Sequence, residues 1–161
     1  MKQKFRIGYG EDIHRLVPQR DLWLGGVRIP FELGLLGHSD ADVLLHAIMD
    51  AMLGALALGD IGSHFPDTDE KFRGISSLIL LEKVYRMLKD SGYSIGNIDS
   101  MIICEKPKIK PFSEQIREKI SRSLNIDTSQ ISLKAGTNEK LDSAGRGECI
   151  IARAIVLLER Q

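Results

Sequence analysis

Residues 39–59 contain the pattern that most constrains the fold, an apolar repeat at helical spacing. Its members are Val43, Leu44, Ala47, Ile48, Ala51, Met52, Ala55 and Leu56, which lie on one face of a helix. Ser39 and Asp40 precede the repeat as candidate N-caps, and Asp42 adds negative charge to the first turn. We therefore expect a central helix that packs one face into the core and ends near Gly59.

Histidines and carboxylates gather at this helix and in the segment near the N-terminus. His46 lies off the apolar face, with Asp42 and Asp50 one turn to either side. Taken alone, such a histidine is more often a hydrogen-bonded boundary residue than a metal ligand. In an extended segment, however, Asp12 and His14 point to the same side. Together with His46 they offer one oxygen and two nitrogens and leave a fourth tetrahedral position open, which is typical of catalytic zinc.

The remaining pattern predicts strands and helices in mixed order. We expect strands near 4–13, 93–104, 131–135 and 149–158, a hairpin over 22–30, a connection over 31–37, and helices near 75–91 and 113–124. This order indicates one domain over 1–161 of the α/β class (α+β type), with a mixed sheet and helices packed on one face. The strand 149–158 is apolar almost throughout, which favours burial on both faces. Another copy of the chain is the obvious cover for the second face.

Charge and cysteine content narrow the class of protein. Lys plus Arg and Asp plus Glu both number 22 in 161 residues, so no net field attracts nucleic acid. Cys104 and Cys149 lack metal or redox spacing and lie in apolar surroundings, which indicates free thiols in a reducing cytoplasm. Residues 1–5 have no apolar signal core and no segment is long enough to cross a membrane. A plastid is the alternative location if a transit peptide preceded this sequence.

Several charged side chains outside the histidine cluster suit a phosphate-bearing ligand. Lys106, Lys108 and Lys110 alternate with other residues, which in an extended segment puts them on one side, either as a solvated edge or as a row facing phosphate. Lys108 and Arg146 supply charge for phosphate oxygens. His38 precedes the helix, where free N–H groups favour an anion.

Oxygen ligands complete the chemistry. Asp60, Asp67 and Asp69 lie in a loop rich in turn residues, either as a solvated acidic turn or as acceptors for the hydroxyls of a polyol. Glu139 could hold a harder cation such as magnesium. These residues together indicate a metal-dependent enzyme acting on a small, hydroxylated, phosphate-bearing molecule.

The chain resembles the 2-C-methyl-D-erythritol 2,4-cyclodiphosphate synthase family over essentially its whole length. The resemblance lies in R-I-G-Y-G-E-D-I-H (6–14), G-H-S-D-A-D-V-L-L-H (37–46), G-D-I-G-S-H-F-P-D-T-D (59–69), K-P-K (106–108), K-A-G-T-N-E-K-L (134–141) and G-R-G-E (145–148). It implies a phosphorus–oxygen lyase of the non-mevalonate isoprenoid pathway. This enzyme converts 4-diphosphocytidyl-2-C-methyl-D-erythritol 2-phosphate to the cyclic diphosphate with release of CMP. The resemblance also implies a homotrimer with active sites between subunits.

The resemblance assigns roles to individual residues. It implies Zn2+ on Asp12, His14 and His46, and a second divalent cation, Mg2+ or Mn2+, on Glu139. It implies transition-state stabilisation by His38 and Thr137, and a supporting position for Asp50 near the zinc-ligating histidine. The implied substrate-binding residues are Asp12, His14, His38, Ser39, Asp60, Ile61, Gly62, Phe65, Asp67, Asp69, Cys104, Lys108, Gly136, Thr137, Glu139, Ser143 and Arg146.

Three positions depart from the family pattern, and two other functions stay open. Gly136 stands where Thr or Ser is frequent, Asp142-Ser143 replaces Gly-Phe, and Lys110 replaces an apolar residue. A metal-dependent nucleotide pyrophosphatase would use the same metal ligands with water as the nucleophile. A non-catalytic trimeric metal-binding module would fill the fourth metal position with a protein ligand.

Overall fold

The structure is a computed structural model that describes residues 3–161. Met1 and Lys2, which begin the stretch expected to lack a signal core, lie outside the described residues. The strands are β1 (Phe5–Pro18), β2 (Leu22–Leu24), β3 (Val27–Ile29), β4 (Leu33–Leu35), β5 (Tyr93–Ile103), β6 (Ile131–Gly136) and β7 (Cys149–Arg160). The α-helices are α1 (Val43–Leu56), α2 (Ile61–His64), α3 (Ser77–Asp90) and α4 (Ser113–Leu124), and single 3-10 turns cover Glu70–Phe72, Lys110–Phe112 and Thr128–Gln130.

Within residues 3–161, five strands form one mixed sheet in the order β4-β1-β7-β5-β6. Strands β5 and β6 run parallel, and the other neighbours pair antiparallel. Strand β1 continues well past the expected end at Ile13, because Leu16–Pro18 pair with β4. Strand β4 itself lies in residues 31–37, which were expected to be a connection without a strand. The mixed sheet is confirmed.

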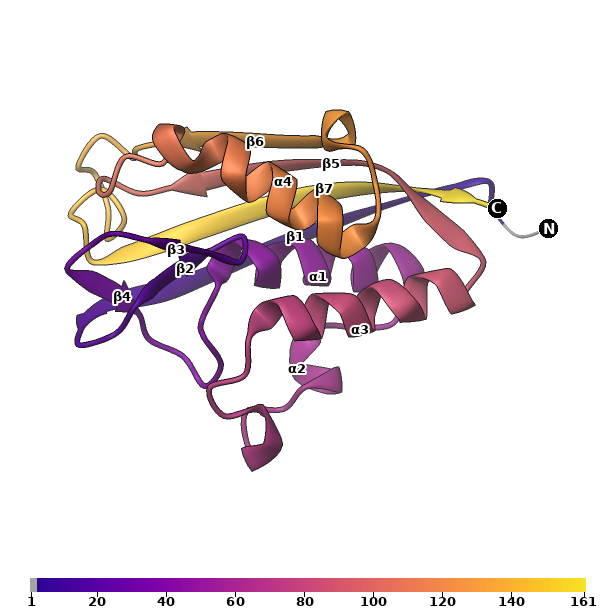
Figure 1. Cartoon of the computed structure of the whole chain (residues 1–161), viewed down its shortest axis with the longest axis horizontal. Coiled ribbons are helices and arrows are strands. Elements are labelled where there is room, and N and C mark those ends of the chain that lie inside the picture. Colours follow the sequence, from indigo (N-terminus) through magenta and orange to yellow (C-terminus); the bar gives the residue numbers. More distant parts are fainter. Residues whose placement is uncertain (1–2) are drawn as a thin grey trace.

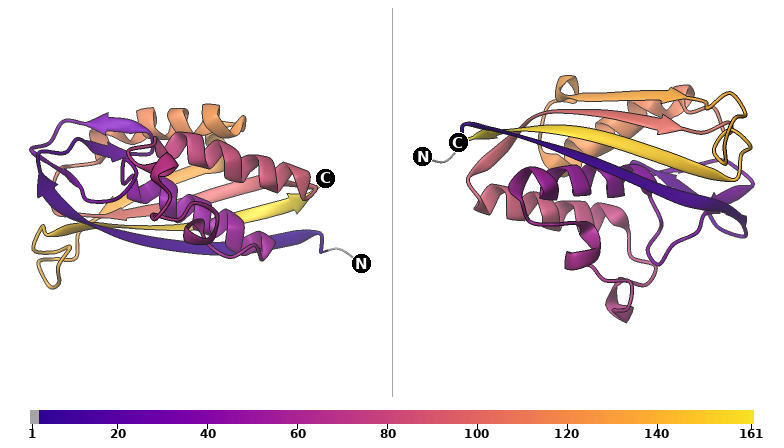
Figure 2. Two further views of the ribbon diagram at one scale, coloured as in Figure 1. Left: turned by 90° about the horizontal axis from the view of Figure 1, so that it is seen from below. Right: turned by 180° about the vertical axis from the view of Figure 1, so that it is seen from behind.

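The helices α1, α3 and α4 pack on the same face of the sheet (Figures 1 and 2). Eleven of the fourteen residues of α1 are buried, so the helix lies inside the core rather than presenting one apolar face. Strands β1 and β7 contact it on one side and α3 on another. Every helix in the described part of the chain is too short or too polar to traverse a lipid bilayer.

The N-cap of helix α1 lies after both N-caps expected from the sequence, Ser39 and Asp40. Its N-cap is Asp42, whose buried carboxylate accepts the Leu45 N–H and also the backbone N–H groups of Gly25 and Gly26. Both glycines have positive φ, +60° and +75°, as the tight turn of the β2–β3 hairpin requires. Asp42 therefore ties the hairpin to α1 and does not face His46.

The other face of the sheet is open in the single chain. Ile7, Tyr9 and Ile13 of β1 are 72%, 57% and 53% exposed, and Ile155 of β7 is 49% exposed. Strand β7 was expected to be covered on both faces. The chain buries the row facing α1 along the strand, but on the other face it buries only the first residues, Cys149 and Ile151, and leaves Arg153 and Ile155 exposed. This open face is where a second copy of the chain would have to lie to meet that expectation.

Candidate active site

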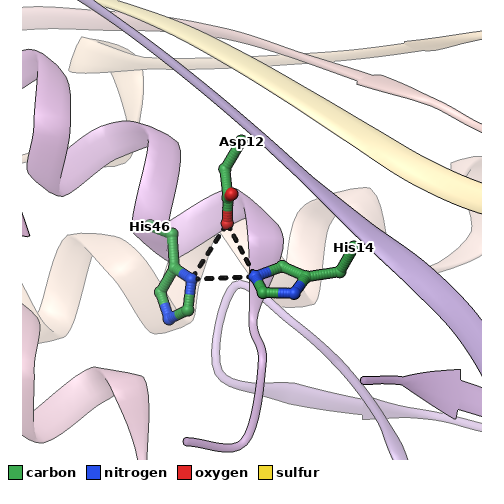
Figure 3. Close-up of side chains that lie close together, drawn as sticks. All are labelled: Asp12, His14 and His46. Carbon is green, nitrogen blue, oxygen red and sulfur yellow. Dashed lines mark hydrogen bonds and ion pairs between the residues drawn. The ribbon is translucent and has the colours of Figure 1, made fainter. Parts of the chain in front are cut away.

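The side chains of Asp12, His14 and His46 meet in one cluster, drawn in Figure 3. Asp12 Oδ2 lies 2.8 Å from His14 Nε2 and 2.9 Å from His46 Nδ1, and these two nitrogens are 3.2 Å apart. Ligand atoms about 2.1 Å from a tetrahedral zinc are separated by about 3.4 Å, close to the dimensions of this triangle. One carboxylate and two imidazoles also form a donor set that zinc accepts. The cluster fits a zinc ion with one coordination position left over.

Two elements bring the cluster together. Alternation along β1 turns Asp12 and His14 toward α1, on the same side as Gly10. At Gly10 the helix approaches so closely that an added Cβ would lie 2.0 Å from the carbonyl oxygen of Ala47. This approach of strand and helix brings His46, one residue before Ala47, against the carboxylate of Asp12.

Electrostatics in the cluster favour a cation. Burial raises the pKa of Asp12, but hydrogen bonds from His14 and His46 outweigh it and hold the pKa below its usual range. Burial lowers the pKa of His14, but the Asp12 carboxylate outweighs it, and the pKa of His14 is raised. The metal-free cluster therefore attracts a proton at its centre, where a divalent cation would take the proton's place.

The far sides of both histidine rings are also hydrogen-bonded. His14 Nδ1 lies 2.7 Å from the carbonyl oxygen of Leu36, to which it donates, so the proton that a cation would displace is the one between Nε2 and Asp12. His46 Nε2 contacts the hydroxyl of Ser77. The carboxylate of Asp50 does not reach the ring of His46 but accepts the Ile61 N–H at 2.8 Å, and burial raises its pKa. Asp50 therefore fastens α2 to α1.

A pocket of about 440 Å³ opens beside the cluster. Besides the three cluster residues, it is lined by six of the residues expected to bind substrate or catalyse, His38, Ser39, Ile61, Gly62, Phe65 and Asp67. Two further expected residues, Asp60 and Asp69, do not line the pocket but lie next to or contact residues that do. Asp60 caps α2 by accepting the Ser63 N–H, and the carbonyl oxygen of Asp69 lies 3.2 Å from His38 Nε2.

A second pocket, of about 150 Å³, contains Cys104, Lys108, Gly136 and Thr137. No described residue lines both this pocket and the one beside the cluster. Burial raises the pKa of the Cys104 thiol to about 11, so it stays protonated at neutral pH. Thr137 Oγ1 donates to the carboxylate of Glu139 at 3.0 Å. The expected site residues that line these two pockets therefore lie in two separate places, with the histidine cluster at only one of them.

The prediction that Lys106, Lys108 and Lys110 lie on one side of an extended segment is wrong. The chain bends there and enters a 3-10 turn at Lys110, so Lys108 and Lys110 line the small pocket while Lys106 lies in a different one. That third pocket also contains Arg146, whose guanidinium pairs with Glu148 at 2.7 Å.

The two remaining departures from the family pattern have local contacts. The thiol of Cys149 donates to the hydroxyl oxygen of Ser143 at 3.4 Å. At Gly136 an added Cβ would come within 2.8 Å of Met101 Cε. A larger residue at 136 would need this flexible side chain to move.

Some lining residues gave no signal in the sequence. Phe72 and Leu80 close the large pocket, and Ser77 reaches His46 from the first turn of α3. All three lie more than 25 residues from His46. Ser77 and Leu80 belong to α3, and Phe72 ends the 3-10 turn that precedes it. Their role depends on how α3 and this turn pack against α1, which the spacing of residues does not encode.

Comparisons with known proteins place these sites in a family. A profile described as the YgbB family matches residues 5–159. The 2-C-methyl-D-erythritol 2,4-cyclodiphosphate synthase of Nostoc punctiforme is 56% identical, with 98% of this chain and 99% of that protein covered.

Solved structures agree with this match. A Plasmodium falciparum IspF solved as a CDP complex is 38% identical, with a TM-score of 0.88 and with 100% and 99% of the two chains covered. A bifunctional IspDF from Campylobacter jejuni is 39% identical with a TM-score of 0.94; 98% of this chain is covered, but only 42% of that longer chain. The profile and the full-length relative together show that this chain belongs to the YgbB family of 2-C-methyl-D-erythritol 2,4-cyclodiphosphate synthases.

Proposed function

We infer that this chain, as one domain over 1–161, is a 2-C-methyl-D-erythritol 2,4-cyclodiphosphate synthase of the non-mevalonate isoprenoid pathway. It is a phosphorus–oxygen lyase that cyclises 4-diphosphocytidyl-2-C-methyl-D-erythritol 2-phosphate and releases CMP. The observation that carries this inference is the Asp12–His14–His46 triangle beside a pocket of about 440 Å³, in a chain that matches a synthase of that name over 98% of its length.

The reaction asks for positioning more than for a strong base. A phosphate monoester has a second pKa of about 6, so the 2-phosphate is already an anionic nucleophile at neutral pH. Its oxygen bonds to the β-phosphorus while the bond from that phosphorus to the bridging oxygen breaks, and CMP leaves with that oxygen. The protein must bring the phosphates into line and neutralise their charge.

We propose that Asp12, His14 and His46 hold Zn2+ and that Glu139 holds a second divalent cation, Mg2+ or Mn2+. Bound there, the metals supply Lewis-acid neutralisation of charge on the phosphate oxygens. The triangle of three ligand atoms supports the first site. The oxygen of Glu139, which is hydrogen-bonded only to Thr137 among the described side chains, supports a harder ion at the second.

Two residues are proposed to act on the transition state. They are His38 and Thr137. His38 lines the pocket beside the cluster, where it would stabilise the charge that develops on a substrate phosphate, and Ser39 in the same pocket would bind that phosphate. Thr137 would stabilise the transition state from the small pocket. We propose that the methylerythritol part is bound by Asp60, Ile61, Gly62, Phe65, Asp67 and Asp69, and the cytidyl part by Cys104, Lys108, Gly136 and Thr137. We propose Ser143 and Arg146 as further substrate-binding residues, Arg146 from a third pocket.

The separation of the two pockets supports a homotrimer with active sites between subunits. Within the described chain the small pocket and the histidine cluster share no lining residue, so one substrate would bridge the cluster of one copy and the small pocket of another. The open face of the sheet, with its exposed isoleucines, supplies an apolar surface for such contacts. We further propose a cytoplasmic location, which the free, buried Cys104 and Cys149 support.

Phosphorus NMR of the cytidyl substrate with the purified protein tests the function. We expect signals of the cyclic diphosphate and CMP to appear together with zinc and magnesium present, and to be absent after chelation. Open phosphates formed with water would instead identify a nucleotide pyrophosphatase. No turnover by a folded, metal-loaded trimer would leave a metal-binding module.

A further inference from the structure

The nitrogen of His46 that faces away from the cluster has a partner of its own. Figure 3 shows this ring with Nδ1 toward Asp12 and Nε2 pointing away. Nε2 lies 3.0 Å from the hydroxyl oxygen of Ser77 and 3.3 Å from that of Ser39. His46 is only 8% exposed and Ser77 is fully buried, so this hydrogen bond is shielded from solvent.

The proton of the Ser77 hydroxyl goes to Asp40. The hydroxyl of Ser77 donates to Asp40 Oδ1, and the backbone N–H of Ser77 donates to Oδ2 at 2.9 Å. An ionised carboxylate only accepts, so the hydroxyl is left with lone pairs for a donor. His46 Nε2–H is the donor in reach. With Nε2 protonated, the lone pair that a metal would take is the one on Nδ1, in place of the proton that Nδ1 shares with Asp12.

The carboxylate is itself held in place. Asp40 Oδ1 also lies 3.2 Å from the backbone nitrogen of Asp42, and the backbone N–H of Asp40 donates to the carbonyl of Ile75 at 3.0 Å. These bonds connect the segment before α1 to the start of α3. Ser39, the other hydroxyl near Nε2, accepts the Ala41 N–H but has no carboxylate behind it.

We propose that Ser77 and Asp40 are positioning residues, and that the chain Asp40–Ser77–His46 fixes the ring and tautomer of His46 with Nδ1 toward the metal. The proposal rests on the metal site of the proposed function. Asp50, to which the resemblance gives a supporting position near this histidine, accepts the Ile61 N–H with its carboxylate. His14 is held differently, through the backbone carbonyl of Leu36, so His46 is the ligand whose orientation a side-chain substitution can change.

The test is metal binding by Ser77→Ala, with Ser77→Thr as the variant that keeps the hydroxyl. Loss of an outer hydrogen bond to a metal-ligating histidine costs about 10- to 100-fold in affinity. We expect Ser77→Ala to weaken zinc, measured by competition with a chromogenic chelator, by that factor. We also expect a shift in the visible absorption of the cobalt-loaded protein. Ser77→Thr should restore both to near wild type.

Ser100→Ala is the matched control for loss of a buried hydroxyl, because Ser100 is 2% exposed and donates to the carbonyl of Ser132, away from the cluster. It should leave metal affinity and the cobalt spectrum unchanged. If Ser77→Ala does not fold, Asp40→Asn tests the same chain of hydrogen bonds, and we expect it also to lower the affinity for zinc.

The outcomes separate the two proposals. An unchanged zinc affinity and cobalt spectrum in Ser77→Ala, or equal losses in Ser77→Ala and Ser100→Ala, would overturn the positioning role. Wild-type protein that takes up no cobalt at the cluster would overturn the metal site and the positioning role with it. Wild-type protein that binds zinc but forms no cyclic diphosphate would contradict the proposed function alone.

Discussion

Strand β1 has two sides that differ in almost every respect. The residues facing α1 include Gly8, Gly10, Asp12 and His14, which lie against the helix or in the histidine cluster. The residues that alternate with them, Ile7, Tyr9, Glu11 and Ile13, point away and stay exposed in the single chain. One side is complete within one copy of the chain, and the other is apolar surface without a cover. The first side builds the fold and the metal cluster; we assign the second to assembly.

The largest effect should come from closing the space between β1 and α1. In Gly10→Ala the new Cβ would lie 2.0 Å from the backbone oxygen of Ala47, so strand and helix must separate. We expect the free energy of unfolding to fall by about 3 kcal/mol or more, measured by urea denaturation.

Gly54→Ala is the matched control on the facing helix. There the Cβ would lie 3.8 Å from the carbonyl oxygen of Tyr9, an ordinary contact. Replacing an exposed helical glycine should leave stability unchanged or raise it by up to about 1 kcal/mol. Equal losses in both variants would contradict the close approach.

The second effect removes the chemistry and keeps the fold. His14→Ala leaves two of the three cluster ligands, so we expect zinc to be lost and turnover to fall at least about 100-fold, because Lewis-acid stabilisation amounts to several kcal/mol. Far-UV circular dichroism should be unchanged. His64→Ala, at a histidine bonded to the carbonyl of Leu58, should keep its zinc; wild-type turnover in His14→Ala would refute the cluster as the metal site.

The third effect concerns the open side alone. Ile7 is 72% exposed in the chain, so Ile7→Glu should fold normally but place three charges in the interface of the proposed trimer. We expect light scattering coupled to size exclusion to find monomers. Ile79→Glu on α3, where the isoleucine is 46% exposed, should remain a trimer. A trimeric Ile7→Glu protein would show that this face is not the interface.

The smallest effect lies in the polar group of the open side. Glu11 accepts hydrogen bonds from Tyr9 and Arg153, both at 2.6 Å, and these hold its pKa below the usual 4.5. A lowered carboxylate pKa stabilises the fold above about pH 4.5, and this contribution is lost as the pH falls through the folded-state value.

Glu11→Gln should therefore cost stability at pH 7, by less than about 0.5 kcal/mol because the pair is exposed and screened. The cost should vanish in strong acid. The free energy of unfolding in urea should be compared at both pH values between Ile7→Glu and the double variant Ile7→Glu/Glu11→Gln. Because Ile7→Glu is expected to be monomeric, this comparison measures the single chain without any effect of assembly. A cost that grows as the pH falls would have the wrong sign.

Much of this arrangement can be predicted from the sequence, since short-range patterns encode it. The D-x-H pair on one side of a strand, the hairpin turn at Gly25-Gly26 and the helix carrying His46 all follow from periods of two and 3.6 residues. Helix α4 lies at the expected bounds, Ser113–Leu124.

The rest depends on contacts between distant segments. Ser39, Asp40 and Asp42 are all plausible caps, and only the position of Gly25 and Gly26 decides for Asp42. Asp40 instead binds Ser77, 37 residues away. Burial of β7 was expected on both faces because its residues are apolar. A single chain covers one face along the strand and the other face only at Cys149 and Ile151. The apolar sequence predicts that this surface is buried, but it does not indicate whether the same chain or another copy of it covers the surface.

The most direct test of the comparison is to coexpress two inactive variants, His14→Ala and Thr137→Ala, and purify mixed oligomers through two different tags. His14→Ala removes the metal cluster and keeps the small pocket, while Thr137→Ala does the reverse. If each active site combines the cluster of one copy with the pocket of the next, every mixed trimer holds one intact site out of three, so the purified mixed trimers should show about one third of wild-type turnover. Each variant alone should stay inactive. Mixed trimers without activity would mean that the whole site lies within one chain.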